Sequence, residues 1–263
     1  MRFASLALVC LLSTSACSTM SKVNRAAADV LMPPSEETKL GRQMAIELQK
    51  QSKVLDNAEV VAYVQRVGNR AAARAENPDR WRFTFTVIDD PQTVNAFAIP
   101  GGHIYVYSGL LKVMRDESQL AGVLAHEIAH VTSRHIAKRM VAAQGLETLS
   151  ALALGKNPGE IAQIVTGLLS QGALLKNSRD DEYEADSIGV VIASKAGYAP
   201  GGLVDFLKLL KQMEGNVPEL LSFLSDHPAT SERIGALQVE IREKRLGGAN
   251  RNAEEFEAIR GRL

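Results

Sequence analysis

The sequence predicts an α+β domain, mostly helical, with a small β-sheet ahead of its central helices. Two short segments, Arg80–Asp89 and His103–Gly109, alternate apolar and polar residues as half-buried strands do. Apolar residues at helical spacing precede these strands, within 35–50 and 57–76, and follow them from Asp116 onward. Because strand patterns are confined to one part of the chain, we expect one sheet covered by helices.

The start of the chain has the pattern of a secretory signal that ends at Cys17. A charged residue is followed by an apolar run too short to span a bilayer, and then by small residues. The segment "TSAC" resembles a bacterial lipobox, although Thr14 stands where such sequences usually have Leu. We therefore predict a signal peptide over 1–17, lipidation of Cys17 and a flexible stalk over 18–34, with ordinary signal cleavage as the alternative. Ser18 favours retention at the periplasmic face of the outer membrane.

Composition indicates one domain without disulfides. Lysine plus arginine and aspartate plus glutamate number 30 each, so the charge balance indicates no nucleic-acid partner. Both cysteines lie in the signal segment, which leaves no disulfide for the folded part. We place one compact domain at 35–246 and a peripheral tail at 247–263. Two apolar stretches, Val141–Leu154 and Ile161–Leu175, are short and contain polar residues, so we predict buried or lid-forming helices rather than membrane spans.

The segment "VLAHEIAHVTSRH", Val123–His135, has metal-binding spacing. His126 and His130 are four residues apart, so a helix places both imidazoles on one face. Glu127 lies beside that face, where a carboxylate can contact a water without being a ligand. This is the H-E-x-x-H arrangement, in which zinc takes two nitrogens and the Glu is the general base. The alternative is two histidines on a polar helix face.

A third ligand distinguishes a zinc site from coincidence. Metzincins have a third His shortly after the second, but Ile136 stands there, and His135 points away from the face of His126 and His130, so that class is excluded. The later segment "SRDDEYEADSIG" offers carboxylates, of which Glu182 and Asp186 share one helix face. We predict Glu182 as the third ligand and Asp186 as the acceptor for a ligand imidazole N–H. The alternative is a solvated acidic helix face.

Four ordered motifs carry a family resemblance. "NAFAIPGGHIYVYSGLL", "HEIAHVTSRH", "SRDDEYEADSIG" and "DHPATSERI" resemble the gluzincin metallopeptidases of the HtpX, Oma1 and CAAX prenyl protease family, over roughly 95–234. The resemblance implies a zincin-type metallopeptidase domain and a zinc endopeptidase activity. It implies site roles for His126, His130, Glu182, Glu127 and Asp186. We expect the small single-domain periplasmic lipoprotein branch, because the sequence shows no transmembrane helices or tetratricopeptide repeats.

The chemistry of such a site follows from its open coordination position. A zinc ion with three protein ligands lowers the pKa of a bound water towards about 7. We expect Glu127 to take the proton from this water and to pass it to the leaving amine. His227 and Arg233, near the helix start in "DHPATSERI", are candidate donors to the carbonyl oxygen. In relatives this His-Pro segment lies at the active site, and its His can occupy the open position; the alternative is that His227 only caps or packs.

An extended peptide is expected to add as a strand beside "GGHIYVY", through Gly101, Gly102, His103, Ile104 and Tyr105. The alternative is an internal strand with both edges paired. The sequence thus predicts an envelope endopeptidase, with one zinc ion per chain, that cleaves misfolded or unassembled envelope proteins. The predicted partners are unfolded envelope proteins and, through the lipid anchor, the membrane. A lipoprotein with structural zinc, or with a chaperone-like role in outer-membrane protein assembly, is the alternative function.

Overall fold

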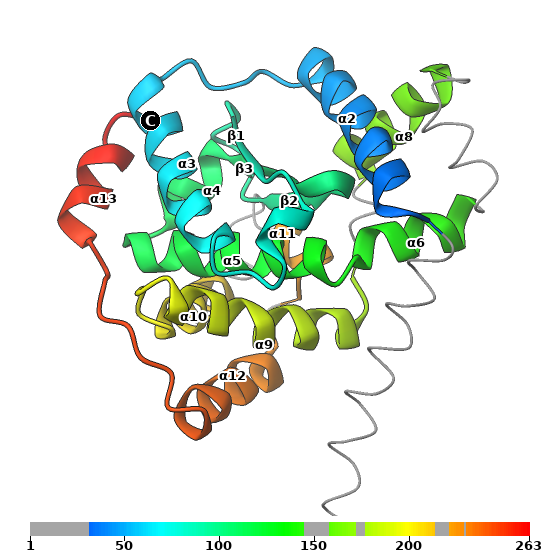
Figure 1. Cartoon of the computed structure of the whole chain (residues 1–263). Helices are drawn as coiled ribbons and strands as arrows, with labels where there is room; N and C mark the ends of the chain where they lie inside the picture. Colours follow the sequence, from blue (N-terminus) through cyan, green and yellow to red (C-terminus); the bar gives the residue numbers. More distant parts are fainter. Residues whose placement is uncertain (1–31, 145–157, 172–176, 214–220, 229) are drawn as a thin grey trace, which may run out of the picture.

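The computed structural model describes residues 32–144, 158–171, 177–213, 221–228 and 230–263 (Figure 1). The predicted signal peptide, the lipidation site at Cys17 and most of the predicted stalk lie outside the described residues. Within the described part, no helix is long and apolar enough to cross a bilayer.

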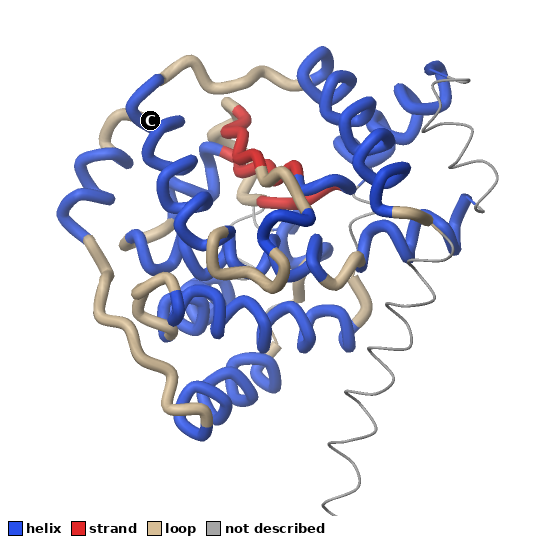
Figure 2. Tube along the Cα trace, in the orientation of Figure 1, coloured by secondary structure: helices blue, strands red, loops and turns tan. Residues whose placement is uncertain are grey.

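Helices surround a small sheet, as the blue and red tubes of Figure 2 show. This arrangement agrees with the predicted mostly helical α+β fold. In chain order the helices and strands are α2 (Pro34–Gln51), α3 (Ala58–Ala72), β1 (Thr84–Ile88), β2 (Ala96–Ile99), β3 (His103–Tyr107), α4 (Ser108–Val113), α5 (Glu117–Thr132), α6 (His135–Gln144), α8 (Pro158–Gln171), α9 (Arg179–Lys195), α10 (Gly201–Met213), α11 (Leu221–Asp226), α12 (Ser231–Glu243) and α13 (Ala253–Arg260).

The sheet has β3 at its centre. Among the described residues its strand order is β1-β3-β2, with β3 parallel to β1 and antiparallel to β2. The turn between β2 and β3 contains Gly101 and Gly102, whose φ values of 84° and 95° lie in a region that side chains disfavour. All four residues of β2 are buried, so this strand shows no apolar–polar alternation. The search for alternating apolar and polar residues therefore did not predict this strand.

The central place of β3 corrects the predicted peptide-binding strand. His103, Ile104 and Tyr105 pair with β1 on one side and with β2 on the other. Their backbone groups are used within the sheet, so no peptide can add beside this strand. Gly101 and Gly102 lie in the preceding turn. The alternative of an internal strand is the one observed.

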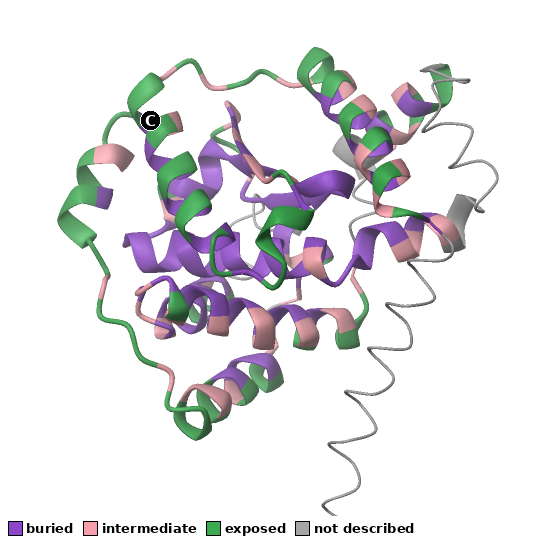
Figure 3. Cartoon of the chain, in the orientation of Figure 1, coloured by how far each residue is buried: buried purple, intermediate pink, exposed green. Residues whose placement is uncertain are grey.

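Helix α5 runs through the core. All its residues from Glu117 to Val131 are buried, as the purple ribbon in Figure 3 shows. Asp116 caps the helix by accepting a hydrogen bond from the backbone N–H of Gln119. Helix α9 approaches α5 closely, because a Cβ on Gly189 would lie 3.0 Å from both the Cα and the backbone N of His126. The two helices thus pack backbone to backbone beside the first motif histidine.

The chain turns sharply between α5 and α6. Helix α5 ends at Thr132, Arg134 adopts a φ of 58°, and α6 starts at His135. Arg134 Nε donates a hydrogen bond of 2.7 Å to buried Glu37 Oε2 on α2, which holds the turn in place. Helices α6 and α8 account for part of the two predicted apolar helices, whose remaining residues 145–154 and 172–175 lie outside the described part.

The tail is docked on the domain. Phe256 of α13 is 1% exposed and its ring centroid lies 6.2 Å from that of Tyr63 on α3. Arg251 pairs with Asp116 at 3.0 Å, next to the start of α5. Residues Ala253–Arg260 of the tail thus form a helix, and the tail is held by one apolar anchor and by polar contacts.

Candidate metal centre

Helix α5 brings the motif histidines together. His126 Nε2 and His130 Nε2 lie 3.0 Å apart, and both residues are buried. Burial lowers the pKa of His130 well below its usual value, which keeps this imidazole neutral as a metal ligand requires. Burial alone would also lower the pKa of His126, but the carboxylates of Glu182 and Asp186 raise it to about 10. A metal ion that binds His126 must therefore displace its proton.

Helix α9 supplies the carboxylates. Ser178 and Asp181 form a capping box at its start, so the helix begins in a fixed register. Glu182 Oε2 lies 3.4 Å from His126 Nε2, and Glu182 Oε1 lies 3.2 Å from His130 Nε2. On the opposite side of the first imidazole, Asp186 Oδ1 lies 3.1 Å from His126 Nδ1. The structure thus brings together the predicted ligand set and the carboxylate predicted to support it.

A fourth group completes a tetrahedral arrangement. His227 Nδ1 lies 3.3 Å from His126 Nε2 and 3.0 Å from Glu182 Oε1. One ligand atom from each of four buried residues, His130 included, lies within 4.8 Å of the others. An ion at roughly 2.0–2.1 Å from each of four ligands would separate them by about 3.3 Å. The residues present therefore fit a tetrahedral metal ion.

Glu127 faces the same cluster, but its contacts are with the backbone of β2 and with His227. Its carboxylate accepts a hydrogen bond from the backbone N–H of Ala98 on β2. Glu127 Oε1 lies 3.5 Å from His227 Nε2 and makes no hydrogen bond in the described part of the chain. Burial raises the pKa of Glu127 above its usual value, against the opposing charges of His227 and His126. A carboxylate with a raised pKa is suited to take up and return a proton.

Arg233 holds the acidic residues in place. Its Nε and Nη2 each donate a hydrogen bond of 2.7 Å to Asp186, and Nη1 donates to the Pro228 carbonyl at 2.8 Å. Nη1 also lies 2.7 Å from Glu182 Oε2. Although burial raises the pKa of Asp186, these hydrogen bonds from Arg233 and the contact with His126 lower it overall. The prediction that Arg233 donates to a substrate oxygen is therefore corrected, because this guanidinium is engaged by the protein's own acceptors.

The sequence did not reveal His135 as a site residue. Its Nδ1 lies 2.8 Å from His130 Nδ1, on the side of that ring away from the cluster. Its Nε2 lies 3.3 Å from Glu184 Oε2. The expectation that His135 points away assumed a continuous helix, whereas Arg134 with positive φ redirects the chain. An arginine carries no sequence signal for that conformation.

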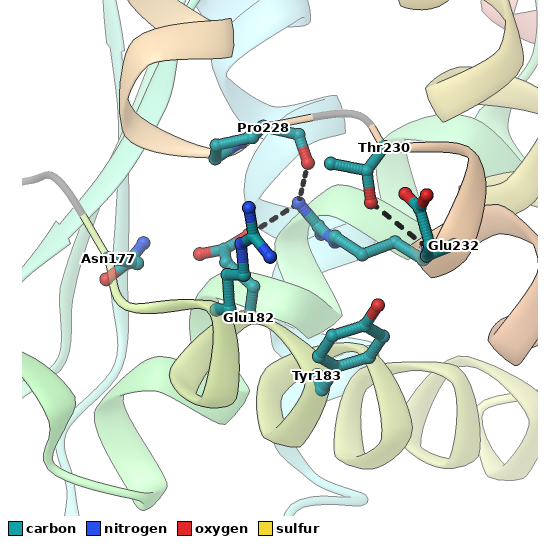
Figure 4. Close-up of a pocket in the computed structure, with 8 residues that line it drawn as sticks. Asn177, Glu182, Tyr183, Pro228, Thr230 and Glu232 are labelled. Carbon is teal, nitrogen blue, oxygen red and sulfur yellow. Dashed lines mark hydrogen bonds and ion pairs between the residues drawn. The ribbon is translucent and has the colours of Figure 1, made fainter.

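Asn177 is a second residue that sequence patterns did not indicate. It lies just before the Ser178 cap of α9, and its Nδ2 is 3.2 Å from His227 Nδ1 and 3.4 Å from His130 Nε2. With Glu182 and Pro228 it lines a cavity of about 290 Å³ beside the cluster (Figure 4). The cavity therefore reaches the buried cluster at Glu182, with Asn177 beside it.

Comparison with known proteins identifies a peptidase family and several relatives named as proteases. The model of peptidase family M48 matches residues 59–241. The mitochondrial metalloendopeptidase OMA1 of Schizosaccharomyces pombe is 34% identical over 187 residues, which cover 70% of this chain and 54% of that protein. The beta-barrel assembly-enhancing proteases of Yersinia pestis and Escherichia coli K12 are 34% and 31% identical, over 65% and 76% of this chain and 37% and 42% of their own lengths. The chain thus spans about half the length of these relatives, or less.

Proposed function

Because the chain belongs to peptidase family M48, we propose that it is a zinc-dependent endopeptidase of the cell envelope that cleaves misfolded or unassembled envelope proteins. The family assignment confirms the predicted resemblance, and the names of the relatives support metalloendopeptidase chemistry. The observation that carries the proposal is the buried cluster of His126, His130 and Glu182 with Glu127 beside it.

The proposed ligands are His126, His130 and Glu182. A zinc ion bound there would acidify a water and polarise the scissile carbonyl. His227 Nδ1 stands at the fourth ligand position and has to leave it before a substrate oxygen can enter. We therefore propose that this geometry is the resting one.

Glu127 is the proposed general base. Its Oε1 takes a proton from the attacking water and then gives the proton to the nitrogen of the leaving amine. The backbone N–H of Ala98 holds the carboxylate, and the raised pKa of Glu127 favours the protonated form between these two transfers. His126 and Glu127 are neighbours on one buried helix, so the base and the ligand keep a fixed separation.

The proposed substrate strand lies along β2 instead of β3. The backbone N–H of Tyr107 donates to Asn95 O, which makes Phe97 and Ile99 the residues bonded to β3. The backbone groups of Ala96 and Ala98 therefore face away from β3. Their N–H groups donate to Asn95 Oδ1 and to Glu127, so a peptide would pair with their carbonyl groups. A peptide that pairs with this edge would have its backbone next to the base.

The envelope role rests on two observations. Relatives named beta-barrel assembly-enhancing protease support outer-membrane protein substrates, and "TSAC" supports lipidation of Cys17. The wild-type protein should incorporate labelled palmitate and fractionate with membranes, whereas Cys17→Ser should do neither. Labelling that persists in Cys17→Ser, or a wild-type protein that is entirely soluble, contradicts the anchor.

A second candidate is a lipoprotein with structural zinc and a chaperone-like role. It is favoured by His227 Nδ1, since four protein ligands are typical of structural zinc sites. The test for both candidates is Glu127→Gln, with Glu243→Gln at an exposed position of α12 as the control. We expect Glu127→Gln to retain zinc and to lose casein cleavage by about 10²–10⁴-fold. Full cleavage would exclude the proposed enzyme, and outer-membrane assembly that continues without cleavage would favour the second candidate.

A further inference from the structure

We infer that the side-chain amide of Asn177 is a catalytic donor that stabilises the negative charge on the carbonyl oxygen of the substrate. The inference rests on the proposed endopeptidase function and adds a residue that neither the sequence motifs nor the ligand set includes. It depends on the position of the amide, on its orientation, and on the fact that the other candidate donors already contact groups of the protein.

The position of Asn177 is defined by the fourth ligand site. His227 Nδ1 marks that site, since it lies at ligand–ligand distance from His126 Nε2 and Glu182 Oε1. Asn177 Nδ2 lies 3.2 Å from this nitrogen. An oxygen that replaces His227 Nδ1 would therefore stand within hydrogen-bonding distance of the amide N–H.

Arg139 fixes the orientation of the amide. Its Nη1 donates a hydrogen bond to Asn177 Oδ1. A guanidinium has donors only, so the amide oxygen has to face Arg139 and the NH₂ group has to face the cluster. Asn177 Nδ2 also lies 3.4 Å from Asp226 O and 3.4 Å from His130 Nε2. One N–H can thus remain on the Asp226 carbonyl while the other points to the fourth ligand site.

The other candidate donors have different partners. Arg233 is bound by Asp186, Glu182 and Pro228, as described above. The second ring nitrogen of His227 lies 3.5 Å from the proposed base. When water attacks the carbonyl carbon, the electron pair of the C=O π bond moves onto oxygen, and this charge then meets the Asn177 N–H. Arg139 contacts Asn177 and, at 3.7 Å, Asp181 Oδ2, and it would reach the substrate oxygen only through Asn177, so it is a positioning residue.

Asn177→Ala and the isosteric Asn177→Asp, both of which lack the N–H donor, test this role. With one zinc ion still bound, kcat on a peptide should fall by about 10²–10³-fold while KM stays within about threefold. The affinity for a peptide phosphinate, whose oxygen imitates the charged carbonyl oxygen, should fall in parallel when measured by titration calorimetry. Asn69→Ala, at an exposed position of α3, is the matched control and should match wild type.

Arg139 provides an independent test if a change at Asn177 impairs folding. Arg139→Ala should lower kcat and phosphinate affinity by a smaller factor, and Arg139→Lys should restore part of both. Wild-type kcat and phosphinate affinity in Asn177→Ala, or a change confined to KM or to zinc content, would overturn the inference. Such a result would leave the proposed function intact as long as Glu127→Gln is inactive. If Glu127→Gln cleaves normally, the proposed function itself is contradicted.

Discussion

The two sides of the metal centre are built from different parts of the chain. The arginine side consists of Glu182, Asp186 and Arg233, which project from the faces of α9 and α12. The helix-end side consists of His135, Asn177 and His227, which lie at the start of α6, just before α9 and just after α11. Paired hydrogen bonds between a guanidinium and a carboxylate link the arginine side. On the helix-end side, imidazoles and an amide contact one another, and each of these side chains also contacts a charged neighbour, namely Glu184, Arg139 or Glu182.

We infer that the arginine side holds the metal ligands in place, whereas the helix-end side contains the group that leaves when a substrate binds. A broken contact on the arginine side leaves a buried charge without its partner, which costs several kcal/mol. A broken neutral hydrogen bond costs about 1 kcal/mol. The group that has to leave the fourth ligand position, His227, meets the carboxylates of Glu182 and Glu127 at 3.0 and 3.5 Å, whereas Arg233 makes four contacts of 2.7–2.8 Å, so His227 has fewer and longer contacts to give up.

The largest expected effect comes from Arg233→Ala, which breaks the arginine side. It removes hydrogen bonds to Asp186 and the partner of Glu182, and all three side chains are at least 96% buried. We expect the free energy of unfolding to fall by about 3–5 kcal/mol in urea titrations. Arg242→Ala, at an exposed position of the same helix, is the control and should change it by no more than about 0.5 kcal/mol. A loss for Arg233→Ala below about 1 kcal/mol would show that the two sides do not differ in this way.

A smaller effect is expected at the crossing of α5 and α9, which sets the distance between the arginine side and the ligand histidines. In Gly189→Ala the added Cβ would meet the His126 backbone at 3.0 Å, so one helix has to shift. We expect a loss of about 1–3 kcal/mol in unfolding free energy, together with weaker zinc binding. Gly235→Ala on α12 is the matched control, because a Cβ there meets nothing within 4 Å. It should instead gain roughly 0.5–1 kcal/mol from its higher helix propensity. A Gly189→Ala protein with wild-type stability would contradict the close packing.

The arginine side could be predicted from sequence to a large extent. Helical periodicity placed Glu182 and Asp186 on one face, and four-residue spacing placed His126 and His130 together. These predictions succeed because a regular helix turns sequence spacing directly into geometry. Arg233 was placed near the site, but its role was wrong, since partners from two other segments decide where its N–H groups point.

The helix-end side was predictable only in part, because its residues follow breaks in regular structure. His227 was placed near the metal by a motif, whereas His135 depends on the positive φ of Arg134 and Asn177 depends on its contact with Arg139. Strand β2 was missed for a related reason: a strand buried on both faces has no alternating pattern to detect. Patterns in a sequence reveal periodic elements well, and tertiary contacts at their ends poorly.

The smallest expected effect compares the supports of the two ligand histidines. Asp186 contacts His126 with a carboxylate, whereas His135 contacts His130 with a second imidazole ring that in turn faces Glu184. Because charge-assisted hydrogen bonds are roughly twice as strong as neutral ones, Asp186→Asn should weaken zinc binding more than His135→Ala does. We expect the loss to be about 10–100-fold for Asp186→Asn and at most about tenfold for His135→Ala.

Competition with a fluorescent zinc chelator measures both losses on the same scale. His103→Ala is the control, because this imidazole contacts Thr84 in the sheet and its loss should leave zinc affinity unchanged. His135→Gln should recover part of the affinity, since an amide oxygen can accept from His130 Nδ1–H as the second imidazole does. If His135→Ala and Asp186→Asn weaken zinc equally, the carboxylate charge is not what distinguishes the two supports. If neither His135→Ala nor His135→Gln changes zinc affinity, His130 is oriented by its own helix alone. The helix-end side would then contribute to substrate chemistry without contributing to metal affinity.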